Sequence, residues 1–243
     1  MLITSIHNEH IKELVRLKEK KYRDQTGTFL VETKHLVLEA YKAGLIKELI
    51  LEQNEIFPLD VTTLYVSREI LKKLSTVESP SKVMAVVNKK DVEEQYGEKI
   101  LILDRIQDPG NLGTIIRSAV AFNINTIVCS PDTVDVYNPK VVRASQGMMF
   151  HIPILVKNTE KLIQELKEQD YKIVGTKVTN GHDVRGASIY SHFALVIGNE
   201  GQGISKNIEE LCDEYLYIKM NENCESLNAS VAASILLYEI NNK

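Results

Sequence analysis

The second half of the chain alternates short apolar segments with segments of helical periodicity, and this alternation restricts the fold more than any other feature. The expected strands are ILILD, TIVCS, IPILV, YKIVG, ALVIG and YLYIK, and the expected helices span residues 115–122, 140–146, 160–168, 204–211 and 228–240. Strands that alternate with helices predict a mostly parallel α/β sheet covered on both faces. Ligands of such sheets lie outside the carboxyl ends of the strands, so we expect the functional residues just after the strands.

The first half of the chain predicts a smaller α/β unit that by itself indicates no chemistry. Apolar residues at helical spacing predict a helix over residues 11–21, and a second helix, HLVLEAYKAG, ends at Gly44. The expected strands are FLVE, KELILE, TLYV and VMAVV. The polar segment Asn88–Lys99 is typical of a linker. We therefore expect two domains, residues 1–92 and 98–243.

Composition is that of an ordinary globular protein. Of the 243 residues, 44% are hydrophobic and 26% are charged, which are common fractions. The three cysteines form no CxxC motif and cannot all pair, which favours a reduced, cytoplasmic chain. The N-terminus has no signal-peptide pattern, and no apolar run approaches the roughly 20 residues of a membrane span. We expect neither a membrane segment nor a metal site.

Charge is distributed unevenly along the chain. The whole protein has a net charge of −4, but residues 1–23 contain six basic and three acidic residues and are net +3. A solvated helix face explains such a segment, and so does a surface that contacts nucleic-acid phosphates. The second interpretation points to Lys18, Lys20, Lys21 and Arg23.

The corner after the first strand of the second half, LDRIQDPGNLGTIIRSA, has the features of a phosphate or ribose site. The residues from Asp108 to Asn111 are of types that favour a turn, and Gly113 allows a ligand or another segment to approach the backbone closely. The helix that follows offers free N–H groups at its N-terminus. Arg117 on that helix could add a forked donor. A tight turn with a surface arginine explains the pattern equally well.

Three further segments are unusual. ALVIGNEGQGIS has three glycines in six residues, with Glu200 among them, directly after an expected strand. In ESLNASVAASILLYE, Ser226 or Asn228 is a good helix N-cap, and the apolar helix that follows suggests burial against the protein or a second subunit. Arg143 and Ser145 come together in NPKVVRASQGMMFHIPI. A flexible loop, a helix cap and surface residues are the ordinary interpretations of these segments.

Three of these segments, in this order, resemble the three motifs of the SpoU (TrmH-like) family of RNA ribose methyltransferases, part of the SPOUT superfamily. LDRIQDPGNLGTIIRSA resembles the first motif, IGNEGQGIS the second and IKMNENCESLNASVAASILLYE the third. The intervening segment with Arg143 also matches, and KYRDQTGTFLVETKHLVLEA is similar to the start of the auxiliary RNA-binding domain of that family. The resemblance implies a ribosomal-protein-like first domain and a second α/β domain with a deep trefoil knot. It also implies S-adenosylmethionine as cofactor, RNA as substrate and a homodimer.

The resemblance also implies roles for individual residues. The expected cofactor contacts are Gly198, Asn199, Gly203, Ile218, Met220 and Leu227. The expected catalytic residues are Asn111, Arg117, Glu200, Ser226 and Asn228, and the expected RNA contacts are Lys18, Lys20, Lys21, Arg23 and Arg143. Thr33, Lys219 and Ala229 depart from the residues often found in the family, which affects specificity more than activity.

The implied reaction transfers a methyl group from a sulfonium to a ribose 2′-hydroxyl, most consistent with ribosomal RNA. An arginine cannot act as a base, since its pKa exceeds about 12, so we expect Arg117 to orient the hydroxyl and stabilise the developing alkoxide. Asn111 and Asn228 would orient the ribose, and Glu200 would hold Arg117 or the substrate. Three alternatives stay open: a transfer-RNA methyltransferase, a non-catalytic RNA-binding protein with this fold, and a Rossmann-type dehydrogenase. The absence of GxGxxG argues against the last.

Overall fold

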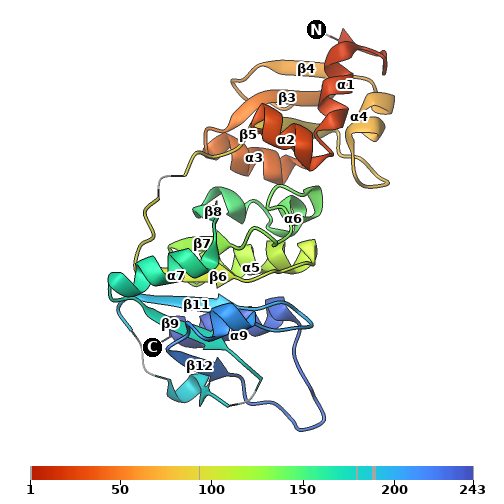
Figure 1. Ribbon diagram of the computed structural model, residues 1–243. Helices are drawn as coiled ribbons and strands as arrows, with labels where there is room; N and C mark the ends of the chain where they lie inside the picture. Colours follow the sequence, from red (N-terminus) through yellow and green to blue (C-terminus); the bar gives the residue numbers. More distant parts are fainter. Residues whose placement is uncertain (1, 93, 179, 188–189, 243) are drawn as a thin grey trace. The chain divides into compact units, whose positions relative to one another are not determined.

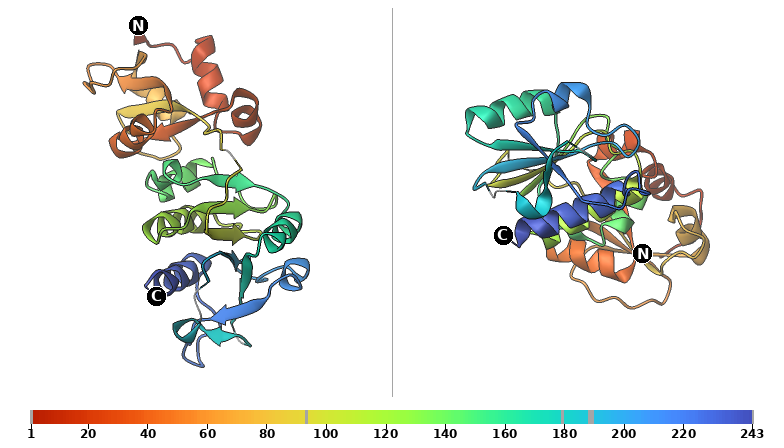
Figure 2. Two further views of the ribbon diagram at one scale, coloured as in Figure 1. Left: turned by 90° about the vertical axis from the view of Figure 1, so that its left-hand side faces the viewer. Right: turned by 90° about the horizontal axis from the view of Figure 1, so that it is seen from below.

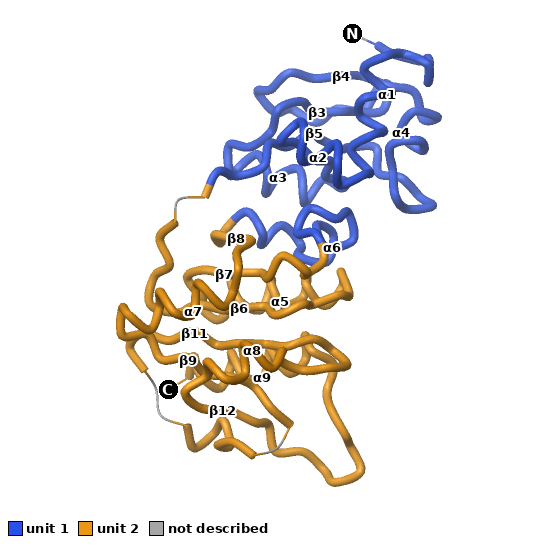
Figure 3. The backbone as a smooth tube through the Cα atoms, in the orientation of Figure 1, with its two compact units in different colours: residues 1–91, 135–150 blue, residues 92–134, 151–243 orange. Residues whose placement is uncertain are grey.

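The structure is a computed structural model that describes residues 2–92, 94–178, 180–187 and 190–242. The chain forms two compact units, Met1–Asp91 with Asp135–Phe150, and Val92–Val134 with His151–Lys243 (Figure 3). The division near residue 91 falls in the expected linker, within which Glu93 lies outside the described residues. The segment Asp135–Phe150 differs from the expected division, because it packs with the first unit.

The first unit is built on a five-stranded mixed sheet in the order β1-β4-β3-β5-β2 (Figure 1). Its strands are β1 (Leu2–Ile3), β2 (Thr28–Glu32), β3 (Ile46–Glu52), β4 (Thr63–Val66) and β5 (Val83–Asn88). Its helices are α1 (Glu9–Arg16), α2 (Lys20–Thr26), α3 (Lys34–Lys42), α4 (Arg68–Leu74), α6 (Pro139–Ala144) and the 3₁₀ helix η1 (Met148–Phe150). The four expected strands are confirmed, while β1 and α4 were not predicted.

The single helix expected over residues 11–21 is wrong, because the chain breaks between α1 and α2. Leu17 at the break is buried in the hydrophobic core. The guanidinium of Arg23 is also buried, and its Nη1 donates to the carbonyl oxygens of Leu17 and Lys18 at 2.8 and 2.7 Å. These two hydrogen bonds satisfy the carbonyl groups at the break between α1 and α2, and apolar periodicity carries no signal for them.

Thr33, one of the departures from the family pattern, has an unusual backbone. Its φ is +106°, a region that favours glycine. Its hydroxyl accepts a hydrogen bond from the N–H of Leu36 at 3.3 Å and so caps α3. The cap offsets part of the backbone strain, which gives a physical reason why a threonine is tolerated there.

The segment Asp135–Phe150 is held in the first unit by charge and aromatic packing. Asp135 lies 2.5 Å from the Arg23 guanidinium. The ring of Phe29 on β2 packs against Tyr137 and Phe150, with centroid distances of 4.8 and 6.3 Å. Residues far apart in the sequence thus complete one core.

The second unit contains a seven-stranded sheet in the order β10-β12-β9-β11-β6-β7-β8, and every strand pair in it is parallel. The strands are β6 (Lys99–Leu103), β7 (Thr126–Cys129), β8 (Ile154–Val156), β9 (Lys172–Thr176), β10 (His182–Asp183), β11 (Phe193–Ile197) and β12 (Glu214–Tyr217). The helices are α5 (Pro109–Ala121), α7 (Thr159–Glu168), α8 (Lys206–Glu209), α9 (Ala229–Asn241) and the 3₁₀ helix η2 (Val184–Gly186). The predicted α/β class and parallel sheet are confirmed.

Helices cover both faces of this sheet. Apolar residues of α7 and α8 form one core cluster with alternate residues of β6, β7 and β11. On the opposite face α5 and α9 pack against each other (Figure 2). None of the helices in the described ranges is both long and apolar enough to cross a lipid bilayer.

The predicted turn at Asp108–Asn111 is wrong in detail, since α5 already begins at Pro109. The carboxylate of Asp108 caps the helix by accepting a hydrogen bond from the N–H of Asn111 at 2.8 Å. Proline suits the first helical position, because its missing N–H would have no intrahelical partner there. Arg117 consequently lies in the third turn of the helix, well beyond the N-terminus.

Candidate active site

A pocket of about 420 Å³ lies at the carboxyl ends of the neighbouring strands β9, β11 and β12. The last residues of these strands, Thr176, Ile197 and Tyr217, form part of its wall. The loops that follow β11 and β12 and the first part of α9 complete it. Its size is within the usual range for small-molecule sites, and its position follows the rule used to search the sequence.

The residues predicted to contact a cofactor are brought together here. The pocket is lined by Gly198, Asn199, Gly203, Ile218, Met220 and Leu227, as well as by the predicted catalytic residues Glu200 and Ser226. These residues come from two loops that follow different strands. Their contact with a cofactor stays a prediction.

The glycine-rich loop after β11 folds back tightly on itself. A Cβ atom on Gly198 would lie 2.2 Å from the backbone of Gly203 and Ile204, so a side chain does not fit. The backbones of Asn199 and Gly203 exchange hydrogen bonds of 3.0 and 2.9 Å. Gly203 has a φ of +69°. The shape of the loop therefore requires glycine at positions 198 and 203.

The side chain of Asn199 makes hydrogen bonds that hold this loop together. Its side-chain oxygen accepts hydrogen bonds from the N–H groups of Gly201 and Gln202 at 3.0 and 3.1 Å. Its side-chain nitrogen donates to the carbonyl oxygen of Arg105 at 2.8 Å. The side chain of Asn199 thus shapes the wall of the pocket.

Three of the predicted catalytic side chains form one chain of hydrogen bonds. Asn228 donates from Nδ2 to Oδ1 of Asn111 at 2.9 Å, and Asn111 donates from Nδ2 to Oε1 of Glu200 at 2.9 Å. Glu200 also accepts from the N–H groups of Gln107 and Asp108, both at 3.3 Å. The chain joins the N-termini of α5 and α9 to the glycine-rich loop.

The surroundings of Glu200 keep it ionised. Partial burial alone would raise the pKa of this carboxyl, but hydrogen bonds from Asn111 and from nearby backbone N–H groups outweigh burial and lower the pKa. A carboxylate with a lowered pKa is a poor proton acceptor, and here the lowering reflects the hydrogen bonds that the ionised form accepts. Glu200 is thus suited to orienting its neighbours.

Arg117 is exposed on α5, and its guanidinium makes no hydrogen bond or ion pair with the described part of the chain. The predicted pairing of Glu200 with Arg117 is absent, because Glu200 faces the start of α5. Arg117 lies six positions after Asn111, which is about 9 Å along a helix. The guanidinium is left available for a ligand.

Ser226 and Asn228 differ in what they do locally. Asn228 is the N-cap of α9, and its Oδ1 accepts from the N–H groups of Ser230 and Val231 at 2.9 and 3.3 Å. Ser226 is exposed at the rim of the pocket. Capping explains Asn228 only in part, since its nitrogen also reaches Asn111.

The basic residues predicted to contact RNA fall into two groups in the first unit. One group is exposed to solvent, and the side chains of the other group have partners within the unit. Lys20 and Lys21 are exposed. Arg23 is a correction, because its side chain is only 4% exposed and is paired with Asp135. Lys18 donates to the carbonyl oxygen of Ser75 at 2.8 Å, and burial lowers its pKa. Arg143 donates to the hydroxyl of Thr76.

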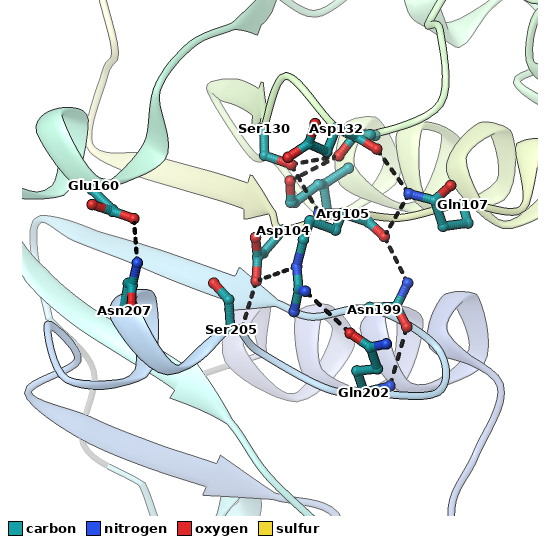
Figure 4. A network of polar contacts seen from close by, with 12 residues as sticks. Asp104, Arg105, Gln107, Ser130, Asp132, Glu160, Asn199, Gln202, Ser205 and Asn207 are labelled. Atoms are coloured by element: carbon teal, nitrogen blue, oxygen red, sulfur yellow. Dashed lines mark hydrogen bonds and ion pairs between the residues drawn. The ribbon is translucent and has the colours of Figure 1, made fainter.

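Three charged residues near the pocket were not predicted from the sequence. Lys177 and Glu209 line the pocket and form an ion pair with each other. Arg105 joins the loop after β6 to the glycine-rich loop in the polar network of Figure 4. Applying the strand-end rule to YKIVG would have found Lys177, which follows β9.

No group of three or more His, Cys, Asp or Glu side chains that could hold a metal ion occurs among residues 2–92, 94–178, 180–187 and 190–242. The charged side chains that line the pocket there are one lysine, Lys177, and two glutamates, Glu200 and Glu209. Because Lys177 and Glu209 pair with each other, Glu200 gives this lining a net negative charge, which favours a ligand with a net positive charge.

Comparisons with known proteins identify the family of this chain. Residues 98–238 match the model of the SpoU rRNA Methylase family, and residues 8–85 match that of the MRM3-like substrate binding domain. A Bacillus subtilis (strain 168) protein, 23S rRNA (guanosine(2553)-2'-O)-methyltransferase RlmP, is 36% identical over 243 residues, which cover 98% of each chain.

Solved structures align with nearly the whole length of the chain. The AdoMet-bound rRNA methyltransferase from Sinorhizobium meliloti aligns with a TM-score of 0.88 and 29% identity, covering 100% of this chain and 97% of that chain. The SpoU methyltransferase AviRb from Streptomyces viridochromogenes, in complex with AdoMet, aligns with a TM-score of 0.87 and 26% identity, covering 97% and 98%.

Proposed function

We infer that this chain, which belongs to the SpoU rRNA methylase family, is an RNA methyltransferase that uses S-adenosylmethionine and methylates a ribose 2′-hydroxyl in ribosomal RNA. The observation that carries this proposal is the hydrogen-bonded chain Asn228–Asn111–Glu200 at the edge of the pocket. It sets polar groups of two helix N-termini beside a cavity of cofactor size.

The pocket suits S-adenosylmethionine in charge and shape. The cofactor carries a sulfonium, an ammonium and a carboxylate, so its net charge is positive, which complements a lining of one lysine and two glutamates. Gly198, Gly201 and Gly203 line the pocket and present backbone groups with no side chain of their own. Thr176, Leu227 and Tyr217 are among the residues that would hold it.

The methyl donor is activated before it binds, because a sulfonium is a good leaving group, so the residues of the chain mainly align the ribose. Asn111 and Asn228 present amide groups whose orientation is fixed by Glu200 and by the cap of α9. Fixing these groups in advance lowers the entropic cost of alignment. The hydrogen bonds among Asn228, Asn111 and Glu200 support this role in aligning the ribose.

Arg117 would act on the reacting hydroxyl or its neighbouring phosphate. Its guanidinium is exposed and without a partner among the described residues, so it is ready to donate to an anion. An arginine side chain does not serve as a base in proteins. We therefore assign it the orientation of the hydroxyl and the stabilisation of the developing alkoxide, with a phosphate or water accepting the proton.

The first unit would hold the RNA outside the target nucleotide. Lys20 and Lys21 are exposed on α2, and Arg16 lies over the ring of Tyr22 at 5.5 Å. Exposed cations beside an aromatic ring suit the backbone and bases of RNA. The relative that is named for 23S rRNA supports ribosomal over transfer RNA as the substrate.

Assembly as a cytoplasmic homodimer also belongs to this proposal. Val231 and Tyr238 on α9 are 46% and 54% exposed, which is high for large apolar residues. A second copy of α9 would cover them. The domain roles of residues 1–92 and 98–243 and the deep trefoil knot stay predictions of the family resemblance.

The test is a methyl-transfer assay on unmodified RNA. Purified protein is incubated with radiolabelled S-adenosylmethionine and, separately, with ribosomal and transfer RNA transcripts, and the label is located by resistance to alkaline hydrolysis. Label at one ribosomal nucleotide supports the proposal, and label in transfer RNA corrects the substrate. Cofactor binding without label in either RNA, or in ribosomal assembly intermediates, would favour a non-catalytic RNA-binding protein.

A further inference from the structure

Arg105 follows directly after Asp104 at the end of β6 and has a backbone conformation that is disfavoured for most residues. Its φ is +59°, the left-handed region that glycine adopts freely. A non-glycine residue persists there only when the surrounding structure holds it. The conformation thus raises the question of what its side chain contributes.

The backbone of Arg105 is held from three sides. Its N–H donates to the hydroxyl of Ser130 at 2.9 Å. Its carbonyl oxygen accepts from Nδ2 of Asn199 at 2.8 Å and from Nε2 of Gln107 at 3.4 Å. The loops after β6, β7 and β11 therefore meet at this residue (Figure 4).

The guanidinium of Arg105 points toward the glycine-rich loop. Nη1 donates to Oε1 of Gln202 at 3.1 Å, and Nε lies 3.5 Å from Oδ2 of Asp104. The same carboxylate oxygen of Asp104, which is 2% exposed, accepts from the N–H of Ser205 at 2.7 Å. Arg105 therefore lies beside a buried carboxylate and reaches the middle of the loop, as Figure 4 shows.

We propose that Arg105 is a positioning residue whose side chain holds the Gly201–Gly203 part of the loop in the shape that receives the cofactor. Asn199 and Ser205 fix the two ends of this loop through Arg105 and Asp104. Between them, Gly201, Gln202 and Gly203 are exposed and line the pocket. The hydrogen bond from the Arg105 guanidinium to Gln202 fixes the part of the pocket wall between these two ends of the loop. The inference rests on the proposed function.

The test separates the side chain from the backbone. Arg105→Gly removes the guanidinium but suits a φ of +59°, so the backbone of the loop should keep its conformation. The melting temperature should fall, because the buried carboxylate of Asp104 loses its cationic neighbour, and binding is therefore measured at a temperature where the variant is fully folded. The dissociation constant of S-adenosylmethionine, measured by calorimetry on the full chain, should rise about fivefold, the order expected for one lost hydrogen bond. The turnover number at saturating cofactor should change by less than about twofold, because the proposed role is in cofactor binding.

Two further variants identify the contact. Arg105→Lys keeps the charge and one donor, and should recover most of the affinity. Gln202→Ala should weaken binding as Arg105→Gly does, and the double variant should be no weaker than either single one, since both remove one contact.

An unchanged dissociation constant in Arg105→Gly, or effects that add fully in the double variant, would overturn the inference and leave the proposed function intact. A wild-type chain that binds no S-adenosylmethionine would overturn both.

Discussion

Asn228 and Asn111 lie 117 positions apart in the sequence, yet the amide nitrogen of Asn228 donates to the side-chain oxygen of Asn111 at 2.9 Å. This hydrogen bond joins the first turns of α9 and α5. It is continued by the bond from Asn111 to Glu200. Each asparagine also belongs to the start of its own helix, so local capping and long-range alignment depend on the same side chains.

The substitution Asn228→Asp separates these two roles. Aspartate caps helices as well as asparagine does, so α9 should remain folded. It cannot donate to Asn111, and the turnover number should fall at least about tenfold, the effect of roughly 1.4 kcal/mol of lost transition-state stabilisation. Asn158→Asp is the matched control, because Asn158 caps α7 far along the chain from the site. Equal activity of both variants would contradict a role for the asparagine pair.

Arg117→Lys tests the assignment of the guanidinium. Lysine keeps the charge but loses the planar fork of donors. We expect the turnover number to fall about a hundredfold, as when one preorganised donor to a developing oxyanion is removed, while cofactor affinity stays unchanged. Single-turnover methylation and calorimetry measure the two quantities. Full turnover with normal cofactor binding would exclude Arg117 from the chemical step.

The Gly198→Ala substitution tests the fold of the glycine-rich loop. The added Cβ would lie 2.2 Å from backbone atoms of Gly203 and Ile204, so the loop must shift. We expect a loss of about 1–3 kcal/mol of unfolding free energy, as for other overpacked sites, and a large loss of cofactor affinity. Gly186→Ala is the control, since a Cβ there meets nothing within 4 Å. Denaturant unfolding and calorimetry should show the effect in the first variant only.

The lowered pKa of Glu200 predicts a pH-dependent contribution to stability. A carboxyl whose folded-state pKa is depressed stabilises the fold above its unfolded value, and this contribution is lost as the pH falls through the folded-state pKa. The difference in unfolding free energy between the wild type and Glu200→Gln should be constant above about pH 5.5 and shrink below the ordinary pKa of 4.5. Urea unfolding between pH 7 and pH 3.5 checks this, and a difference that grows on acidification would contradict it.

The two groups of basic residues predict different outcomes. Replacing Lys20 and Lys21 by glutamine should leave the melting temperature unchanged and weaken RNA binding. The slope of log affinity against log salt should become shallower by about 0.7 for each single-strand phosphate contact that is lost. Arg23→Ala should instead lower the unfolding free energy by about 3 kcal/mol, because it leaves Asp135 without its partner in a largely buried pair. Filter binding at several salt concentrations and thermal unfolding separate the two cases.

The sequence by itself determined the alternation of strands and helices, the parallel sheet and the loops that form the site. The apolar residues of ILILD and ALVIG are buried on both faces of the sheet. A continuous apolar run in the sequence therefore indicates a strand that is covered on both faces. The rule that ligands lie at the carboxyl ends of strands then pointed to the loops after β6, β11 and β12. The individual catalytic and cofactor residues came from the family resemblance.

Only the tertiary structure decided which polar groups are partners. Glu200 meets Asn111 and not Arg117 because α5 begins at Pro109, two residues before Asn111, so that Arg117 lies further along the helix. Arg23 is a buried partner of Asp135, although its neighbours Lys20 and Lys21 are exposed. Charge and periodicity are local properties of a sequence. Hydrogen-bond partners depend on how the fold brings distant segments together, and no local pattern encodes which side chains will then be neighbours.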